Sequence, residues 1–549
     1  MTGPLSGTNF PSANRMTVSA LSPLTGIWGE SNAGGILAPQ IKFAGYDGIV
    51  IRNASPRPVY LDISEAGVQI RDAEGLWGLD TYQTYESLSA TARRPAVACI
   101  GPAGEKLAPM AAIVHNRGHL FGRTGMGAVM GSKKLKAIKV LGRNRIPPYD
   151  PGRVREVRAR LLQKQKDSLA IQSLTAYGTN TNMEVGPLVG DVPIKNWVLG
   201  EWDGIERINA AAYSETILRG TGTCYACPVA CKRVVEVPDG PYQTSRGPGP
   251  EYETVANFGT MIINDDLPSI ARANELCNRY GLDTISLGTT IAFAVECYQN
   301  GIIGARETGG IELRWSDPDL LIALAEGAGR AEGFGGQLAR GSAALAREWG
   351  PKAQKLLSTV KGLEAPAHDP RGSHGVGLAY ATSTRGACHV NCLTYPVESG
   401  GAVYPLLGLA GAPVGQSAEG KAAMVIKSQN FGQVFGCAAA VCHLGGLTFD
   451  EQDLLDMLNS ATGWDLTLDE LLLAGERIWC LKRLINNLRG VTSANDRLPE
   501  KLVTPLDSGP AAGSVPDLDQ MLSEFYALRG LDESGRPSPE KLGQLGLKE

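Results

Sequence analysis

The sequence predicts an α+β protein in which a strand-rich first part is followed by mainly helical parts. Apolar and polar residues alternate at several places before residue 148, which is typical of strands, whereas apolar residues recur at helical spacing after Pro151. The chain has 549 residues, too many for one ordinary core at about 150 residues per domain. We expect domains at 1–148, 149–358 and 359–549, with a composition shift near Ser358 marking the second boundary.

The strand-rich part contains one hairpin that the sequence indicates clearly. Apolar side chains alternate with polar ones over residues 59–63, and Glu65–Gly67 then turns the chain into residues 68–70. Residues 53–58 hold two prolines and are expected to form a loop. Further strands are predicted at 49–51, 96–100 and 135–141.

The helical part begins at a recognisable start signal. Asp150 can cap a helix whose first residue is Pro151, and Val154, Val157 and Leu161 then recur on one face. The tail after residue 498 is rich in Pro, Gly and Ser, so we expect it to run over the surface. Further helices are predicted at 269–280, 320–332, 454–458 and 471–488.

Composition excludes several classes of protein. The net charge of −4 gives no strong basic field for nucleic acid. The sequence has no uncharged apolar run of about 18 residues, so no membrane span is expected. No secretory signal is visible at the N-terminus, and the odd count of 11 cysteines argues against a disulfide framework. These features predict a cytoplasmic protein.

Three cysteines form the strongest chemical motif, because Cys224, Cys227 and Cys231 lie within eight residues. A C-x2-C-x3-C run can supply three ligands to a [4Fe–4S] cluster. Zinc is the competing metal, and a structural or redox role is the third interpretation. The other cysteines in apolar stretches, Cys99, Cys277, Cys297 and Cys480, are expected to be buried. A fourth ligand could come from Cys388, Cys392, Cys437 or Cys442.

Three further motifs are ambiguous on their own. The loop Gly122–Lys134 contains Gly125 and Gly127 and suits phosphate contact, yet it matches neither known phosphate-binding pattern and equally fits a turn before a strand. Glu253, just after Pro250, could be catalytic or could be a helix N-terminal charge. His389 follows Arg385-Gly-Ala-Cys and could be catalytic or structural.

Taken together and in order, these motifs resemble those of the tungsten-containing aldehyde:ferredoxin oxidoreductases. The similarity extends from the first residues to Leu528-Arg-Gly530. The matching runs are Gly3–Gly7, Lys42–Asp47, Ile100–Glu105, Gly122–Ile138, Cys224–Cys231, Pro250–Glu253, Gly281–Ile285, Asp369–Gly372 and Gly463–Asp465.

The resemblance implies a fold, cofactors and an activity. The first domain would be a saddle of two sheets that carries a bis-molybdopterin with tungsten or molybdenum, and a magnesium ion bridging the pterin phosphates is a further candidate. The cofactor would oxidise a small aldehyde to a carboxylic acid. A [4Fe–4S] cluster would pass the electrons to ferredoxin or to an iron–sulfur partner subunit, and a homo-oligomer is compatible with the family.

The resemblance also assigns residues by position. Glu253 resembles the active-site glutamate and His389 the active-site histidine. Arg15 resembles an arginine between cluster and pterin. The cluster ligands would be Cys224, Cys227, Cys231 and Cys442, and the remaining pterin and phosphate contacts would be Asn32, Arg123, Gly125, Gly127 and Asp283.

Some positions depart from the family pattern. Asn278 and Cys437 replace aspartates of pterin-contact motifs, and Arg272 and Glu275 replace the ligands of an interface iron. Members usually have a segment before the Gly-Pro-Leu run, so we expect a first domain that is truncated or completed by a partner. Two rival functions stay open: reduction of an aryl-CoA thioester by the same cofactor, and a non-catalytic iron–sulfur carrier.

Overall fold

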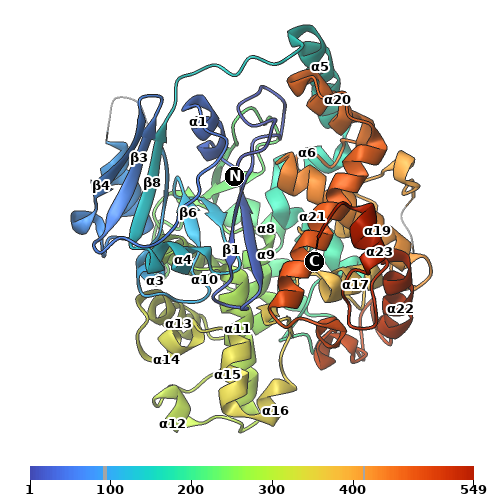
Figure 1. Cartoon of the computed structure of the whole chain (residues 1–549). Helices are drawn as coiled ribbons and strands as arrows, with labels where there is room; N and C mark the ends of the chain where they lie inside the picture. Colours follow the sequence, from blue (N-terminus) through green and yellow to red (C-terminus); the bar gives the residue numbers. More distant parts are fainter. Residues whose placement is uncertain (91–94, 412–413, 549) are drawn as a thin grey trace.

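The N-terminal part of the molecule contains two sheets (Figure 1). The structure is a computed structural model that describes residues 1–90, 95–411 and 414–548. One sheet is the antiparallel pair β1 (Met16–Leu21) and β2 (Trp28–Ala33). The other has the strand order β4-β3-β8-β5-β6-β7. Its strands, in that order, are Gly67–Asp72, Val59–Ser64, Leu135–Leu141, Ala96–Cys99, Ile113–His115 and His119–Phe121. The prediction of a β-rich part with two sheets is therefore confirmed.

The predicted hairpin is formed by β3 and β4, which pair antiparallel. Gly67 begins β4 with φ +125°, a conformation that glycine adopts readily. The strand predicted at 49–51 is absent from the described chain, and this prediction was wrong. Ile49 and Ile51 pack against the sheet's core while Val50 is exposed, but no strand pairs with the segment. The segment is apolar, but it lacks the hydrogen-bonded neighbour that defines a strand.

Two short helices cover the six-stranded sheet. They are α1 (Leu37–Phe43) and α4 (Met126–Ser132). Ile41 of α1 and Met126 of α4 are buried in the same core as Ile63 and Val140 of the strands. The glycine-rich loop of the sequence thus contains a helix that packs against the sheet.

The helices predicted after residue 148 are present. In α5 (Pro151–Asp167) the side chain of Asp150 accepts a hydrogen bond from the N–H of Arg153 at 2.9 Å, and the three predicted apolar residues are buried. Helix α10 (Leu267–Tyr280) ends at Gly281, whose φ is +74°. The other predicted helices correspond to α13 (Pro318–Arg330), α20 (Glu451–Thr462) and α21 (Leu468–Leu488).

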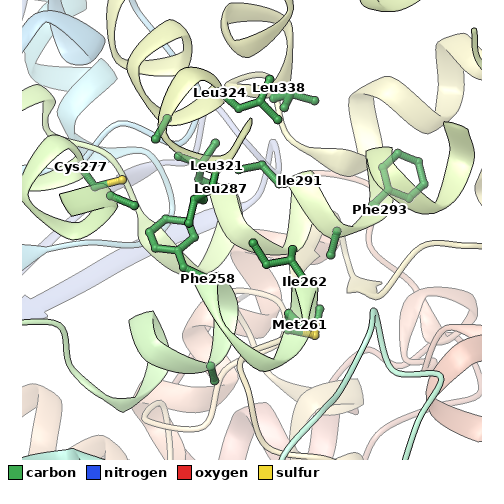
Figure 2. Close-up of a cluster of buried hydrophobic side chains, with 14 of the residues drawn as sticks. Phe258, Met261, Ile262, Cys277, Leu287, Ile291, Phe293, Leu321, Leu324 and Leu338 are labelled. Carbon is green, nitrogen blue, oxygen red and sulfur yellow. The ribbon is translucent and has the colours of Figure 1, made fainter. Parts of the chain in front are cut away.

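The largest core lies among α9 (Tyr252–Phe258), α10, α11 (Thr284–Gln299) and α13 (Figure 2). Phe258, Leu287 and Leu321 are each buried there. Because this core holds α9 and α11 rigidly, it also fixes Glu253 in the first turn of α9 and Asp283 at the N-cap of α11. The four cysteines expected to be buried, Cys99, Cys277, Cys297 and Cys480, are buried.

The C-terminal tail does not simply run over the surface, so that expectation is corrected. Helix α22 (Leu518–Arg529) places Met521 and Phe525 in the core of the C-terminal part, both at 0% exposure. Its apolar residues recur at helical spacing, a signal that the surrounding Pro, Gly and Ser masked. Among the described helices, none combines the length and apolar character that crossing a bilayer requires.

Candidate active site and thiol cluster

Two adjoining cavities bring the sequence motifs together. Their volumes are about 540 and 690 Å³. The first cavity is lined by residues of β1 and β2, of the chain around β7, of the N-terminal ends of α9 and α11, and of segments 385–391 and 436–444. The two cavities share part of their walls, including Arg15, Glu253, His389 and Cys442. Groups from all three predicted domains therefore meet at one place.

Four thiols line the second cavity. Three come from the loop between β9 (Leu218–Gly222) and β10 (Lys232–Val235), which curls tightly because Ala226 and Ala230 adopt φ of 54° and 51°. The fourth follows a π-helical segment, Gln433–Ala438, that continues α19 (Lys421–Gly432). The four are Cys224, Cys227, Cys231 and Cys442.

The thiols oppose one another's ionisation. Burial raises the pKa of Cys224, and a negative charge on Cys442 raises it further. Burial and the Cys442 charge also raise the pKa of Cys227. Thiolates are the form that binds metals, so a bound metal would relieve this repulsion. By donor type alone, four thiols fit either a [4Fe–4S] cluster or a zinc ion.

The other candidate fourth ligands lie elsewhere. Cys437 lines the first cavity, not the second, and its Sγ is 3.9 Å from Nζ of Lys482; burial raises the pKa of this thiol to about 11. Cys388 accepts a hydrogen bond from Arg385 Nη2 at 2.6 Å. Cys392 is buried beside Thr394. The structure thus brings Cys442, and not these three, to the clustered thiols.

Arg15 lies between the two cavities. Its Nη1 donates to Sγ of Cys442 at 3.7 Å, and its Nη2 donates to the carbonyl of Asn32 at 2.9 Å. Asn32 also contacts the guanidinium through its side-chain oxygen. Close by, a Cβ added to Gly34 would lie 2.8 Å from Sγ of Cys224. This region of β2 therefore packs directly against the thiol cluster and directs a cation at it.

Arg123 and Asp283 form an ion pair in the wall of the first cavity, with Nε 3.3 Å from Oδ2. Asp283 also accepts a hydrogen bond from the N–H of Ile285 at 3.1 Å, which caps α11. Arg123 donates to the carbonyls of Glu364 and Ala387 at 2.7 and 3.0 Å. These contacts hold the ion pair in a fixed position in the cavity wall.

The structure places Gly125 and Gly127 outside the walls of both cavities. The N–H of Gly127 already donates to the carbonyl of Ala111 at 2.8 Å. A Cβ on Gly127 would lie 2.4 Å from the carbonyl oxygen of Ala112, and one on Gly125 would lie 2.1 Å from that of Pro109. Close packing of α4 on this backbone explains these glycines, so their expected phosphate contact receives no support from the geometry.

Glu253 faces two histidines at the wall shared by the cavities. Its Oε1 is 3.3 Å from Nδ1 of His389 and 3.6 Å from Nε2 of His368. Its Oε2 accepts a hydrogen bond from the N–H of Ala367 at 2.9 Å. Sequence reasoning missed His368, although it lies within the Pro366–Gly372 segment. The chain has only six histidines, and His368 directly precedes the motif residue Asp369. That position was a signal that could have pointed to His368.

Burial and charge set the protonation of this group. Burial raises the pKa of Glu253, although His368 partly opposes the shift. Burial, followed by the charges of His368 and Arg123, lowers the pKa of His389 well below its usual value. At neutral pH His389 is therefore an uncharged imidazole with one donor and one acceptor nitrogen. Perturbed groups of this kind in a cavity are typical of catalytic sites.

Several side chains that line the first cavity carry a buried polar atom that has no hydrogen-bond partner among the described residues. The unpartnered atoms include a carboxylate oxygen, two guanidinium nitrogens and an imidazole nitrogen, and their owners line the cavity. These atoms are Glu30 Oε1, Arg117 Nε, Arg385 Nε and His443 Nε2. Buried polar groups normally find partners, so this wall fits a large polar ligand such as a pterin with anionic phosphates.

The chain matches two family models in sequence order. Residues 1–142 match the model for the aldehyde ferredoxin oxidoreductase N-terminal domain, and residues 156–547 match the model for domains 2 and 3. The chain belongs to the aldehyde ferredoxin oxidoreductase family. The membership predicted from the ordered motifs is confirmed, whereas the boundaries near residues 148 and 358 stay predictions.

Three relatives match over the whole chain. The tungsten-containing aldehyde ferredoxin oxidoreductase of Pyrococcus furiosus is 37% identical, with 100% of this chain and 89% of the relative covered. That of Pyrococcus abyssi is 38% identical, with 100% and 90% covered. The P. furiosus aliphatic sulfonate oxidoreductase, WOR-like subunit, is 30% identical, with 100% and 88% covered.

A solved structure shows the same fold. The active-site complex BamBC of benzoyl coenzyme A reductase superposes with a TM-score of 0.83 at 23% identity, over 100% of this chain and 88% of that one. At this identity the likeness establishes architecture alone.

Proposed function

We propose that this chain oxidises aldehydes to carboxylic acids at a tungsten bis-pterin centre in the first cavity. Electrons would leave through a [4Fe–4S] cluster bound by Cys224, Cys227, Cys231 and Cys442, to ferredoxin or an iron–sulfur partner subunit. One observation carries the proposal: Glu253 and His389 line both the first cavity, of about 540 Å³, and the adjoining cavity that four thiols line. The names of the relatives at 37–38% identity support the aldehyde as substrate.

The residues present fit both cofactors. Cationic side chains and side chains with unpartnered buried polar atoms line the first cavity, and four thiols line the second. Arg123 and Asp283 would contact the pterin, and Arg15 would link it to the cluster. When bound, the metal centre would supply an acceptor for two electrons and polarise the reacting oxygen.

Glu253 is suited to take a proton from water. The N–H of Ala367 holds one oxygen in place, which leaves Oε1 free to face the reacting groups. A carboxylate with a raised pKa is a stronger base once ionised, and positioned bases are worth about 10²–10⁴ in rate. Once Glu253 has taken the proton, Nδ1 of the neutral His389 can accept a hydrogen bond from Oε1, 3.3 Å away, which leaves Nε2–H to donate to the oxygen of the substrate.

The second cavity would admit the substrate. Leu169 and Val185 belong to its lining and are exposed at the surface, whereas Leu174 and Val229 are buried deeper in. Apolar walls favour uncharged aliphatic or aromatic aldehydes over anionic ones such as glyoxylate. We therefore expect a higher kcat/KM for benzaldehyde-type substrates than for anionic aldehydes.

The test combines metal analysis with substrate turnover. Purified protein should contain tungsten or molybdenum together with about four iron atoms per chain, and it should reduce a low-potential dye when an aldehyde is added. Iron without tungsten or molybdenum would favour an electron carrier instead. Zinc at the four thiols would refute the cluster, and turnover of aryl-CoA esters without aldehydes would move the activity to thioester reduction.

A further inference from the structure

His368 and Asp191 stand behind Glu253 in a defined order. Nδ1 of His368 is 2.8 Å from Oδ2 of Asp191, and its Nε2 is 3.6 Å from Oε1 of Glu253. The side chains of His368 and Asp191 are each only 4% exposed. We propose that His368 and Asp191 form a proton relay that removes the proton from Glu253 after each turnover. This proposal rests on the aldehyde oxidation proposed above.

Asp191 is held in place for this role. Its Oδ2 also accepts hydrogen bonds from Nδ2 of Asn182 at 2.9 Å and from the hydroxyl of Tyr395 at 3.2 Å. The ring of Tyr395 lies 4.0 Å from that of His368, centroid to centroid. Because the carboxylate accepts the Nδ1 proton, the lone pair of His368 lies on Nε2, toward Glu253. The imidazole therefore has both the orientation and the tautomer needed to accept a proton from Glu253.

The cavities give the relay a direction. Glu253 lines both, whereas His368, Asn182 and Tyr395 line the second alone. Two hydroxyl groups also line this cavity, and Oγ of Ser173 lies 2.5 Å from Oγ1 of Thr181. A proton on His368 therefore leaves on the side away from Arg123 and Asp283.

The charges around His368 raise its pKa, so that the imidazole can accept a proton. Burial lowers the pKa of His368, but the charge and hydrogen bond of Asp191, together with Glu253, outweigh burial, and the net shift is upward. The pKa of Glu253 is also raised by burial. Because Oε1 of Glu253 and Nε2 of His368 are only 3.6 Å apart, the charge of each group affects the titration of the other. The other titratable or charged groups near this pair are Tyr252, Tyr380, Tyr395, His389, Arg123 and Asp283.

The step balances without electrons. Protonated Glu253 transfers its proton to Nε2 of His368, which leaves a carboxylate and an imidazolium paired with Asp191. The imidazolium then loses a proton from Nε2 to water in the second cavity, which His368 lines, and this restores the neutral Nδ1–H imidazole. Aldehyde oxidation releases two protons per turnover. Rapid deprotonation of Glu253 therefore keeps the base ready for the next turnover and sustains kcat.

The test uses the holoenzyme and two variants, His368→Gln and Asp191→Asn. We expect kcat to fall about 10- to 100-fold in each, with KM for the aldehyde little changed. In Asp191→Asn the pKa of His368 drops, so the acid limb of the kcat–pH profile should move to lower pH. The matched control is His374→Gln, because His374 is buried, bonds Ser514 at 2.9 Å and lines neither cavity. It should keep both kcat and the profile.

A second readout does not depend on turnover. In protein labelled with ¹⁵N-histidine, NMR should give six pairs of ring-nitrogen signals, one pair per histidine, and the pair lost in His368→Gln belongs to His368. We expect that signal to show the Nδ1–H tautomer and a pKa above the ordinary imidazole value, and to shift downward in Asp191→Asn.

The outcomes separate the two proposals. A parent enzyme that is active on aldehydes, with kcat and pH profile unchanged in His368→Gln, overturns the relay alone. The Nε2–H tautomer, or a pKa insensitive to Asp191→Asn, also overturns it. A parent enzyme inactive toward every aldehyde overturns the proposed function and the relay's role in it, even where the NMR titration follows expectation.

Discussion

Replacing Glu253 with glutamine removes a base but keeps the shape of the side chain. The amide oxygen of glutamine can accept the hydrogen bond that Oε2 now accepts from Ala367 at 2.9 Å. The amide nitrogen would then face Nε2 of His368, 3.6 Å from the present Oε1. Both contacts suit an amide, so we expect the fold and the cofactor content to survive. A loss of activity in this variant would therefore report the loss of proton transfer and not a change in the structure.

The expected loss follows from the role of the carboxylate. A positioned general base contributes about 10²–10⁴ in rate, which corresponds to about 2.7–5.5 kcal/mol of transition-state stabilisation. We expect kcat for aldehyde oxidation to fall by that factor. Metal analysis should give the same tungsten or molybdenum and iron per chain as in the parent.

The stability of Glu253→Gln should be equal to or higher than that of the parent, although its activity is lower. Burial raises the pKa of Glu253 in the folded protein, so the folded state binds more protons than the unfolded state as pH rises above the ordinary carboxyl value. Stability then falls with rising pH over that window, and a neutral glutamine removes this penalty. The Tm of Glu253→Gln at pH 7 should equal or exceed that of the parent.

The assay measures dye reduction with an aldehyde at several pH values, beside the control Glu364→Gln. Glu364 is another buried glutamate whose pKa burial raises, but it lines neither cavity. Its Oε1 accepts from Ser342, which glutamine can also do, so activity should persist. Full activity in Glu253→Gln with normal metal content would refute the catalytic role of Glu253, and equal losses in the two variants would show a general effect of buried charge.

Three further predictions concern the cluster, the glycine loop and a buried ion pair. Cys442→Ser should lower iron per chain and the cluster's EPR signal while Cys437→Ser leaves both unchanged; equal behaviour of the two would remove Cys442 as the fourth ligand. Gly127→Ala should lower the free energy of unfolding by about 1–3 kcal/mol, because a Cβ meets backbone at 2.4 Å, and denaturant unfolding that matches the parent would contradict the packing role. Lys421→Met should cost about 3–5 kcal/mol in the same assay, since it leaves Glu398 buried and unpaired, and the double change with Glu398→Gln should recover part of that loss.

Sequence patterns predicted the fold well where local signals agreed with the tertiary environment. Asp150 and Pro151 fixed the start of α5, and the alternation over residues 59–63 fixed β3. The pattern failed at residues 49–51, because a strand needs a neighbour that no local pattern specifies. It failed again in α22, whose buried face is surrounded by turn-forming residues.

The site was predicted in part for a similar reason. Cys224, Cys227 and Cys231 are close in sequence, so their spacing alone indicated a metal. His368 and Asp191 are 177 residues apart and meet only in the folded chain, and nothing local to either residue indicates the other. Gly127 shows the converse. Its glycine-rich pattern suggests ligand contact, but the backbone that packs against α4 leaves no room for a side chain at this position.

The thiols that line the second cavity come from two segments, and 211 residues separate Cys231 from Cys442. During translation the first three thiols emerge from the ribosome long before the fourth. Whatever group they hold together can be completed only after the C-terminal helices have been synthesised and docked. Insertion of a group held by all four thiols would therefore be a late maturation step, and such a group would cross-link two distant segments of the chain.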